Sequence, residues 1–178
     1  MDKETGISIM KIVPKLDAGP YMLQKKIIIN TKDNFVSLSN KLSEIGSNLI
    51  IDAISLFENR KIKFIDQNEK VATYASKIEK KESVITWNES SQKLIAKING
   101  LNPYPGVWFK HKGKRIKIIE AELSNEQGIA GKVLTNNLIV GCQDKAIKIN
   151  ILQKEGKKAL NTKSFLAGYK ISKGEILQ

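Results

Sequence analysis

The stretch that decides the fold is NPYPGVWFKHKGKRIKIIEAEL, residues 102–123. After its second proline, Pro105, the apolar residues follow a period of two, which is typical of strands rather than helices. Two such runs, residues 107–109 and 116–123, flank the sequence His-Lys-Gly-Lys at 111–114, a favourable composition for a tight turn. The stretch therefore predicts an antiparallel hairpin at the start of a β-rich domain.

Further strand-like runs follow this hairpin. They lie at residues 133–134, 138–142 and 146–152, and turn-forming residues separate them at 136–137 and 143–144. Roughly five short antiparallel strands suit a small closed barrel of the OB type. A short helix at about 162–169 is expected to end the domain.

A helix is expected immediately before the hairpin, with Asn88 or Ser90 as its N-cap. Gly100 and Pro103 end it. Before the helix, residues 58–89 carry dense charges with poor periodicity and no richness in glycine, serine or proline. They predict an extended connector that lies against a domain rather than a free linker.

The N-terminal part has the pattern of an α/β fragment. Residues 7–13 are mostly apolar and rich in isoleucine and valine, which predicts a strand buried on most of its surface in an α/β sheet. A second strand is expected at 21–29, followed by one long amphipathic helix ending near Phe57. Two strands and one helix cannot bury both faces of such a sheet. The sequence therefore predicts a truncated Rossmann-like α/β domain at residues 1–57, the connector at 58–89, and an OB-like β-barrel domain at 90–178.

The charge points to a polyanionic partner. Thirty Lys and Arg residues against eighteen Asp and Glu residues give a formal net charge of +12, and cations that neutralise phosphates release counterions. Only Arg60 and Arg115 are arginines. A lysine excess of this kind also suits a compositionally biased genome, so nucleic-acid binding and compositional bias both stay open.

Several classes of protein are disfavoured by the composition. No apolar run is long enough to cross a bilayer, and the first residues lack the pattern of a signal peptide. Cys142 is the only cysteine, so neither an intramolecular disulfide nor a cysteine metal cluster can form. We expect a cytoplasmic protein that has no membrane partner.

Five segments, in order along the chain, carry a resemblance to a known family. They are ETGISIM with LDAGP (4–10, 16–20), the run from Tyr74 to Trp87, NPYPG with Trp108 (102–108), LQKEGKK (152–158) and FLAG (165–168). Together they are similar to methionyl-tRNA formyltransferases. The match is to the C-terminal part of that family, without most of the N-terminal catalytic domain.

The resemblance implies transfer of a formyl group from 10-formyltetrahydrofolate to methionine on initiator tRNA, in translation initiation. The family uses an Asn, a His and an Asp, which stabilise the oxyanion of the tetrahedral intermediate and accept the amine proton. Asp17 matches the family's Asp, and Pro14, Lys15 and Leu16 match a loop that borders the pterin. The family's Asn and His lie upstream of the matched region, and His111 does not match that His by position. We therefore expect this chain alone to be inactive. A truncated gene, a split gene with a separately encoded N-terminal half and a deliberately shortened chain all fit this pattern, and only the split gene implies an N-terminal partner chain.

Exposed cations beside turns are expected to contact the phosphates of initiator methionyl-tRNA. They are Lys112, Lys114, Arg115, Lys157 and Lys158, and they would supply affinity that does not depend on sequence. A solvated lysine face is the competing interpretation.

Three aromatic residues, Trp87, Tyr104 and Trp108, have two interpretations. They are able to stack on bases, but we expect them to pack the connector and the helix against the barrel. Cys142 is expected to be a small buried strand residue and His111 an exposed hairpin residue.

Two alternative functions stay open. Sugar-nucleotide formyltransferases share the expected fold and the motif around Asp17, whereas the positive charge and the Gly156-Lys157-Lys158 segment favour the tRNA enzymes. The second alternative is a non-enzymatic, basic tRNA-binding remnant.

Overall fold

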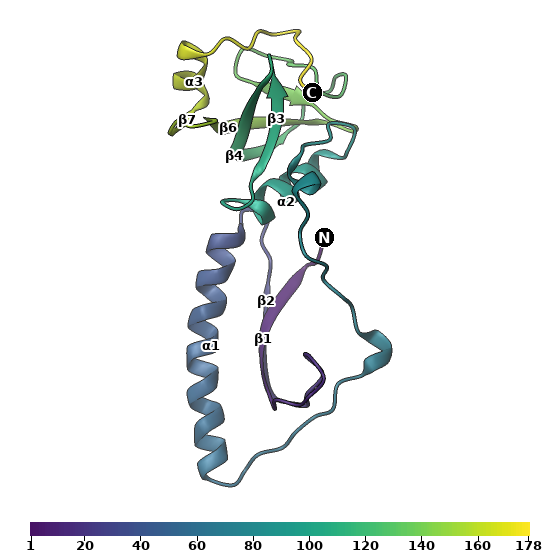
Figure 1. Cartoon of the computed structure of the whole chain (residues 1–178), viewed down its shortest axis with the longest axis vertical. Coiled ribbons are helices and arrows are strands. Elements are labelled where there is room, and N and C mark those ends of the chain that lie inside the picture. Colours follow the sequence, from purple (N-terminus) through teal and green to yellow (C-terminus); the bar gives the residue numbers. More distant parts are fainter. The chain divides into compact units, whose positions relative to one another are not determined.

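The computed structural model describes all residues, 1–178, and it divides into two compact units (Figure 1). The N-terminal unit comprises residues 2–77, and the C-terminal unit comprises residues 78–178 together with Met1. The expected connector at 58–89 is therefore shared between the two units, with the division after Lys77.

A helix and a hairpin come early in the C-terminal unit. Helix α2 (Ser91–Leu101) begins after Ser90, whose side chain accepts a hydrogen bond from the backbone of Lys93. Strands β3 (Val107–His111) and β4 (Lys114–Ser124) form the expected hairpin, with Val107 opposite Ile118. The sequence predicted both elements because a cap, a helical stripe and a period of two are all local signals.

The sheet of this unit has five strands. Its order is β3-β4-β6-β5, and β7 pairs with the last part of β6 on the same edge as β5, opposite β4. The remaining elements are β5 (Ile139–Gly141), β6 (Ala146–Lys154), β7 (Ala159–Asn161), helix α3 (Thr162–Gly168) and the short 3-10 helix η2 (Lys80–Ser83). All pairs are antiparallel.

Irregular segments join the two outer edges of this sheet. Residues 132–134 pair with β5, and the C-terminal residues pair with 131–133 on one side. On the other side the backbone N–H of Lys110 in β3 donates to the carbonyl oxygen of Gln178 at 2.7 Å. The sheet is therefore curled into a barrel-like domain. The strand expected at 133–134 is reduced to bridges within this closure.

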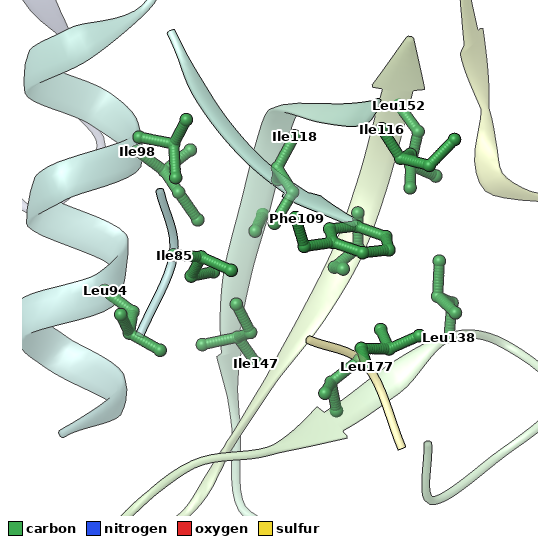
Figure 2. Close-up of a cluster of buried hydrophobic side chains, with 14 of the residues drawn as sticks. Ile85, Leu94, Ile98, Phe109, Ile116, Ile118, Leu138, Ile147, Leu152 and Leu177 are labelled. Atoms are coloured by element: carbon green, nitrogen blue, oxygen red, sulfur yellow. The ribbon is translucent and has the colours of Figure 1, made fainter. Parts of the chain in front are cut away.

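One hydrophobic core fills the interior of the C-terminal unit (Figure 2). Most of its fully buried members come from α2 and from the inward positions of β3, β4 and β6, including Leu94, Phe109, Ile118 and Ile149, and strand β5 adds Val140. Trp87 packs edge to face on Phe109, with ring centroids 5.9 Å apart. Twenty buried residues belong to this cluster, so the C-terminal unit has a core of its own.

The N-terminal unit is a two-stranded sheet with one helix. Strands β1 (Glu4–Met10) and β2 (Tyr21–Ile28) are antiparallel, and helix α1 (Phe35–Glu58) packs against both. The unit also contains the 3-10 helix η1 (Glu69–Val71). The first strand was expected at 7–13, but it ends at Met10, where the register shifts and the backbone of Lys11 bonds to Pro20.

The surroundings of these strands differ from the expected buried α/β sheet. No residue of β1 or β2 is buried, and within α1 only Ala53 is. A parallel strand pair, which a Rossmann-like domain requires, is absent from this unit. What the structure establishes is a β-hairpin covered on one side by a helix.

Helix α1 is fixed at its start by Asp33 and Asn34. The Asn34 side chain accepts a hydrogen bond from the backbone N–H of Ser37, and the Ser37 hydroxyl oxygen accepts one from the backbone N–H of Asn34. The Asp33 carboxylate accepts bonds from Lys41 at 2.6 Å and from the backbone of Asn30 at 2.9 Å, which together hold its pKa well below the usual range. Although α1 is 24 residues long, neither it nor any other helix has the apolar length that crossing a bilayer requires.

Candidate nucleic-acid interface

The β3–β4 hairpin presents three of the predicted cations. Lys112 and Gly113 form its two-residue turn with φ of 49° and 73°, the combination that a type I′ turn requires. A Cβ atom added at Gly113 would meet only open space, so its role is the positive φ. Lys112, Lys114 and Arg115 are all exposed.

A second basic turn follows β6. The backbone N–H of Lys157 donates to the carbonyl oxygen of Lys154 at 3.0 Å, and Gly156 between them has φ of 70°. The backbone of Glu155 bonds to that of Arg115 at 3.3 Å, so this turn lies beside the start of β4. Two turns that are about 40 residues apart in sequence therefore lie side by side in the fold.

Three lysines converge where the turns meet. The pKa of Lys154 is lowered, first because the Lys114 ammonium repels its charge, then by desolvation, with Lys157 adding further repulsion. Concentrated positive charge of this kind is what a phosphate neutralises. The structure thus brings together predicted Lys114 and Lys157, and it adds Lys154, which the sequence analysis did not single out. Its nearness to Lys114 depends on the β4–β6 register, which places Ile116 opposite Lys154.

The other predicted cations have different surroundings. Lys112 lies 3.5 Å from a carboxylate oxygen of Glu175, and Lys158 is exposed beside Lys157. The Arg115 guanidinium lies over the ring of Trp108, 4.4 Å from its centroid.

The aromatic residues divide into buried and exposed ones. Trp87 is 6% exposed and packs in the core, which confirms the expected packing role. Trp108 is half-buried. Tyr104 is 87% exposed, so the expectation that it packs the helix against the barrel was wrong. It lies in the turn between α2 and β3.

His111 is buried, and its expected exposure in the hairpin was wrong. It is the last residue of β3 and continues the inward phase of Val107 and Phe109. Its Nε2 lies 2.8 Å from an oxygen of Glu175, and its Nδ1 lies 3.1 Å from the hydroxyl oxygen of Tyr169. Cys142 is buried as expected, and burial raises the pKa of its thiol to about 12.

The predicted catalytic and pterin-side residues lie in the N-terminal unit, between β1 and β2. Asp17 is exposed in a turn with φ of 52°. The side-chain amide of Gln67 fixes this turn by donating to the carbonyl oxygens of Asp17 and Gly19 at 2.9 and 2.7 Å.

The three preceding residues are also exposed. Lys15 is paired with Glu69 at 2.6 Å, whereas Leu16 is 87% exposed. Pro14, Lys15 and Leu16 therefore form one open edge rather than an enclosed pocket.

Comparisons with known proteins show the family to which the C-terminal domain belongs. Residues 77–170 match the model of the formyl transferase C-terminal domain. A methionyl-tRNA formyltransferase of Pelagibacter ubique is 46% identical over 98% of this chain, and one of Jannaschia is 36% identical over 99%. The chain covers 56% and 58% of those two proteins, so it spans little more than half the length of its curated relatives.

Solved structures share the fold. HypX from Aquifex aeolicus aligns with 98% of this chain and 32% of its own, with a TM-score of 0.74 and 19% identity. A methionyl-tRNA formyltransferase from Clostridium thermocellum aligns with 72% of this chain and 55% of its own, with a TM-score of 0.52 and 21% identity. At these identities the likeness concerns the fold alone.

Proposed function

This chain belongs to the formyl transferase family through its C-terminal domain, and from that premise we propose that it is the tRNA-binding part of a methionyl-tRNA formyltransferase. The complete enzyme would transfer a formyl group from 10-formyltetrahydrofolate to methionine on initiator tRNA. The curated relatives that match nearly the whole chain carry the name of this enzyme. The observation that carries the proposal is the meeting of two basic turns on the barrel-like domain, where the backbone of Glu155 bonds to that of Arg115 and Lys154 lies opposite Ile116.

The lysine cluster would bind the phosphate backbone of tRNA. The ammonium groups of Lys114 and Lys157 lower the pKa of Lys154 by repelling its charge, and a phosphate beside Lys154 would relieve that repulsion. Lysine ammonium groups contact phosphates as point charges and carry no base specificity. The cluster would therefore position tRNA on the OB-like barrel and leave recognition of the initiator to other contacts.

Asp17 is proposed to be the catalytic Asp of the family. Its carboxylate is exposed, and Gln67 holds its turn in place. Beside an imidazole it would keep that ring charged and accept the amine proton through water. The histidine of the chain cannot supply this ring, because His111 is bound by Glu175 and Tyr169. The imidazole and the amide that stabilises the oxyanion would come from the region of the relatives that this chain does not span.

The residues expected to border the folate do not form a complete site. Leu16 exposes an apolar side chain, and Lys15 is held by Glu69. We propose that Pro14, Lys15 and Leu16 supply one border of a folate pocket whose other walls belong to the rest of the enzyme.

Exposed apolar side chains on the N-terminal unit are consistent with an interface for another protein part. On α1, the side chains of Ile51, Ile54 and Phe57 are 64%, 53% and 69% exposed, although the helix already packs on β1 and β2. Exposed apolar groups in such number mark an interface. We propose that the remaining catalytic part of the enzyme, as a separately encoded N-terminal half or as a continuation of this chain, covers them.

A sugar-nucleotide formyltransferase is the competing enzyme. An N-formyltransferase from Helicobacter canadensis, solved with folinic acid and dTDP-3-aminofucose, shares the fold with a TM-score of 0.67 at 20% identity. The basic turns of the C-terminal unit favour tRNA, which carries many phosphates, over a sugar nucleotide, which carries two. A basic remnant without enzymatic activity would share the same lysines, and only an activity measurement separates it from the proposal.

The test is tRNA binding by the full chain, measured by fluorescence anisotropy at several salt concentrations. We expect Lys114→Gln, Lys154→Gln and Lys157→Gln together to reduce the slope of log affinity against log salt by about 2 to 3, because each lost phosphate contact removes about 0.9. The matched control removes Lys93, Lys145 and Lys148, which lie at or near the opposite end of β6 and are exposed or half-buried. Equal effects of the two triple variants would mean that binding follows net charge alone and would overturn the proposed site.

A further inference from the structure

Four residues of the β3–β4 hairpin point away from the core and form one surface. Trp108 pairs with Lys117, and Lys110 pairs with Arg115. Directly paired residues of two antiparallel strands lie on the same side of the sheet. The residues that alternate with these four are buried in the core, so the four lie on the opposite side. This surface is called the outer hairpin face below.

Arg115 is held in place on the outer hairpin face. The central carbon of its guanidinium lies over the ring of Trp108, 4.4 Å from the centroid, which is a cation–π contact. Its backbone is fixed as well, because the carbonyl oxygen of Arg115 accepts a hydrogen bond from the backbone N–H of Glu155 at 3.3 Å. A guanidinium is planar, and Arg115 is exposed. The side of the guanidinium that faces away from Trp108 is therefore open to a second flat group.

Tyr104 lies at one end of the outer hairpin face. The connection is Lys117, whose ammonium lies 3.4 Å from the carbonyl oxygen of Pro103, the residue before Tyr104. Gly106 makes room for this lysine, since a Cβ atom added there would lie 2.5 Å from its Cε atom. Tyr104 is 87% exposed, so its ring adds little to the core. An aromatic ring in this position is able to accept a nucleic-acid base on its flat side.

The cations of the outer hairpin face are not paired with carboxylates. The salt bridges of the structure include none of its two lysines and its arginine. Exposed carboxylates of β4 lie farther along the strand, where Glu122 pairs with Lys148 at 2.8 Å and Glu120 accepts a hydrogen bond from Asn150 at 3.3 Å. Charge is therefore separated along β4, and its cationic end is open to an anion from outside the chain.

We propose that the outer hairpin face, together with Tyr104, binds unpaired nucleotides of RNA. One base stacks on Tyr104 and another on the open side of the Arg115 guanidinium. Lys110 and Lys117 contact the phosphates between them. Trp108 is a positioning residue, because it holds the guanidinium in the orientation that stacking requires. This inference rests on the proposed tRNA-binding function.

The flat groups are what favour unpaired RNA over a duplex. A base exposes its flat side only where it is not stacked in a helix, whereas phosphates are accessible in paired and unpaired RNA alike. The lysine cluster at the two basic turns contacts phosphates and does not distinguish the two. Arg115 directly follows Lys114 in β4, so the outer hairpin face adds this distinction next to the lysine cluster.

The first arm of the test compares two RNAs of equal length, a single strand without secondary structure and a paired duplex. Fluorescence anisotropy measures their binding to the full chain. The variant Tyr104→Leu with Arg115→Lys keeps the net charge and removes both flat groups. We expect it to bind the single strand roughly 10- to 100-fold more weakly, because both stacked bases lose their support. Its affinity for the duplex should change by less than about twofold.

The matched control is the variant Arg60→Lys with Tyr74→Leu. Arg60 is the other arginine of the chain, Tyr74 is 91% exposed, and both lie in the N-terminal unit. This variant should bind both RNAs as the wild type does. An equal loss in the two double variants would overturn the inference. So would an equal loss for the two RNAs, because Tyr104 and Arg115 would then contact phosphates rather than bases.

Tryptophan emission is the second arm, and it reports where the single strand binds. The chain has two tryptophans, and Trp87 is 6% exposed, so a change in emission on binding should come from Trp108. Trp108→Phe keeps an aromatic ring beneath Arg115, and we expect it to retain affinity within about threefold. The change in emission should be lost in this variant. A change that persists would place the RNA elsewhere and overturn the inference.

These outcomes separate the inference from the proposed function. If the chain binds tRNA but the Tyr104 and Arg115 variant binds the single strand like the wild type, the inference fails and the proposed function stands. If the chain binds the single strand as expected but does not bind tRNA, the proposed function fails and the outer hairpin face remains a site for unpaired RNA. A chain that binds neither RNA overturns both.

Discussion

The side-chain amide nitrogen of Asn102 lies 2.9 Å from the carbonyl oxygen of Ile118, and this bond ties the end of α2 to strand β4. The same nitrogen donates to the carbonyl oxygens of Ile98 at 2.9 Å and Ile119 at 3.2 Å. Asn102 is 8% exposed, so water does not replace these bonds easily. One side-chain amide group therefore donates to carbonyl oxygens of both α2 and β4 and joins these two elements.

Replacing Asn102 by Ala should destabilise the C-terminal unit by about 1 to 3 kcal/mol, because the carbonyl oxygen of Ile118 loses this donor whereas that of Ile98 keeps the backbone N–H of residue 102. Urea unfolding followed by tryptophan fluorescence measures this, since Trp87 belongs to the same core. Asn137→Ala in an exposed loop is the control and should stay within about 0.5 kcal/mol of the wild type. A loss no larger than that of the control would contradict the assigned role of Asn102.

The stability of the C-terminal unit should depend on Glu175 in acid. The hydrogen bond from His111, followed by that from the backbone of Ser172, lowers the pKa of this carboxyl to about 2. Its folded pKa lies below its unfolded value, so its contribution is complete above about pH 4.5 and is lost as the pH falls toward 2.

The variant that tests this is Glu175→Gln, which should be about 1 to 2 kcal/mol less stable than the wild type at pH 7. That difference should shrink as the pH falls from 4.5 to 2, because the wild-type carboxyl becomes neutral as well. Urea unfolding at a series of pH values measures it, with Glu155→Gln in an exposed turn as the control. A difference that stays constant with pH would show that the charge of Glu175 is not what stabilises the fold.

The sequence predicted those helices, strands and turns whose signals lie within the element itself or next to it. The cap at Ser90, the period of two after Pro105 and the Lys112-Gly113 turn lie within a few residues of the elements they define. The closure of the barrel-like sheet depends instead on Gln178 reaching Lys110, a pairing between distant segments that have no periodicity of their own. Strand β7 was missed because its three residues are all exposed and do not alternate.

In the candidate site, too, the sequence predicted residues with local signals and missed those brought in by pairing between distant segments. The exposed cations at the two turns were predicted, but Lys154 enters the cluster only through the β4–β6 register. His111 is the instructive error, because the alternation Val107, Phe109, His111 already placed it inward. A polar residue at the end of a hairpin was assumed to be exposed, whereas partners about 60 residues away satisfy both of its nitrogens.

Cys142 should be unreactive in the folded chain. Its side chain is 2% exposed, and burial raises the pKa of its thiol to about 12, so almost no thiolate forms at pH 8. We expect modification by a disulfide reagent to be at least about 100-fold slower in buffer than in urea. As the chain has one cysteine, the rate in buffer reports opening of the core. Rapid stoichiometric labelling without denaturant would contradict this packing.

The exposed apolar side chains of α1, Ile51, Ile54 and Phe57, should form the interface with the catalytic part. Ile54→Lys with Phe57→Lys should improve the solubility of the isolated chain, because both apolar side chains are more than half exposed. The same pair should abolish co-purification with the N-terminal part of a relative such as the Pelagibacter enzyme. Ser43→Lys with Ser47→Lys, at exposed polar positions of the same helix, is the control and should leave both properties unchanged. Retained co-purification of the Ile54 and Phe57 variant would place the interface elsewhere.

Asp17 should matter only when the catalytic part is complete. This chain mixed with the N-terminal part of a relative should formylate initiator methionyl-tRNA, and the chain alone should not. In the mixture, Asp17→Asn should lower the rate by about 10²- to 10⁴-fold, because an amide neither keeps an imidazole charged nor accepts a proton. Asp66→Asn, exposed in the same unit, controls for the loss of one negative charge. Full activity of the Asp17 variant would leave the carboxylate as a turn residue, held in place by Gln67, and would remove it from the mechanism.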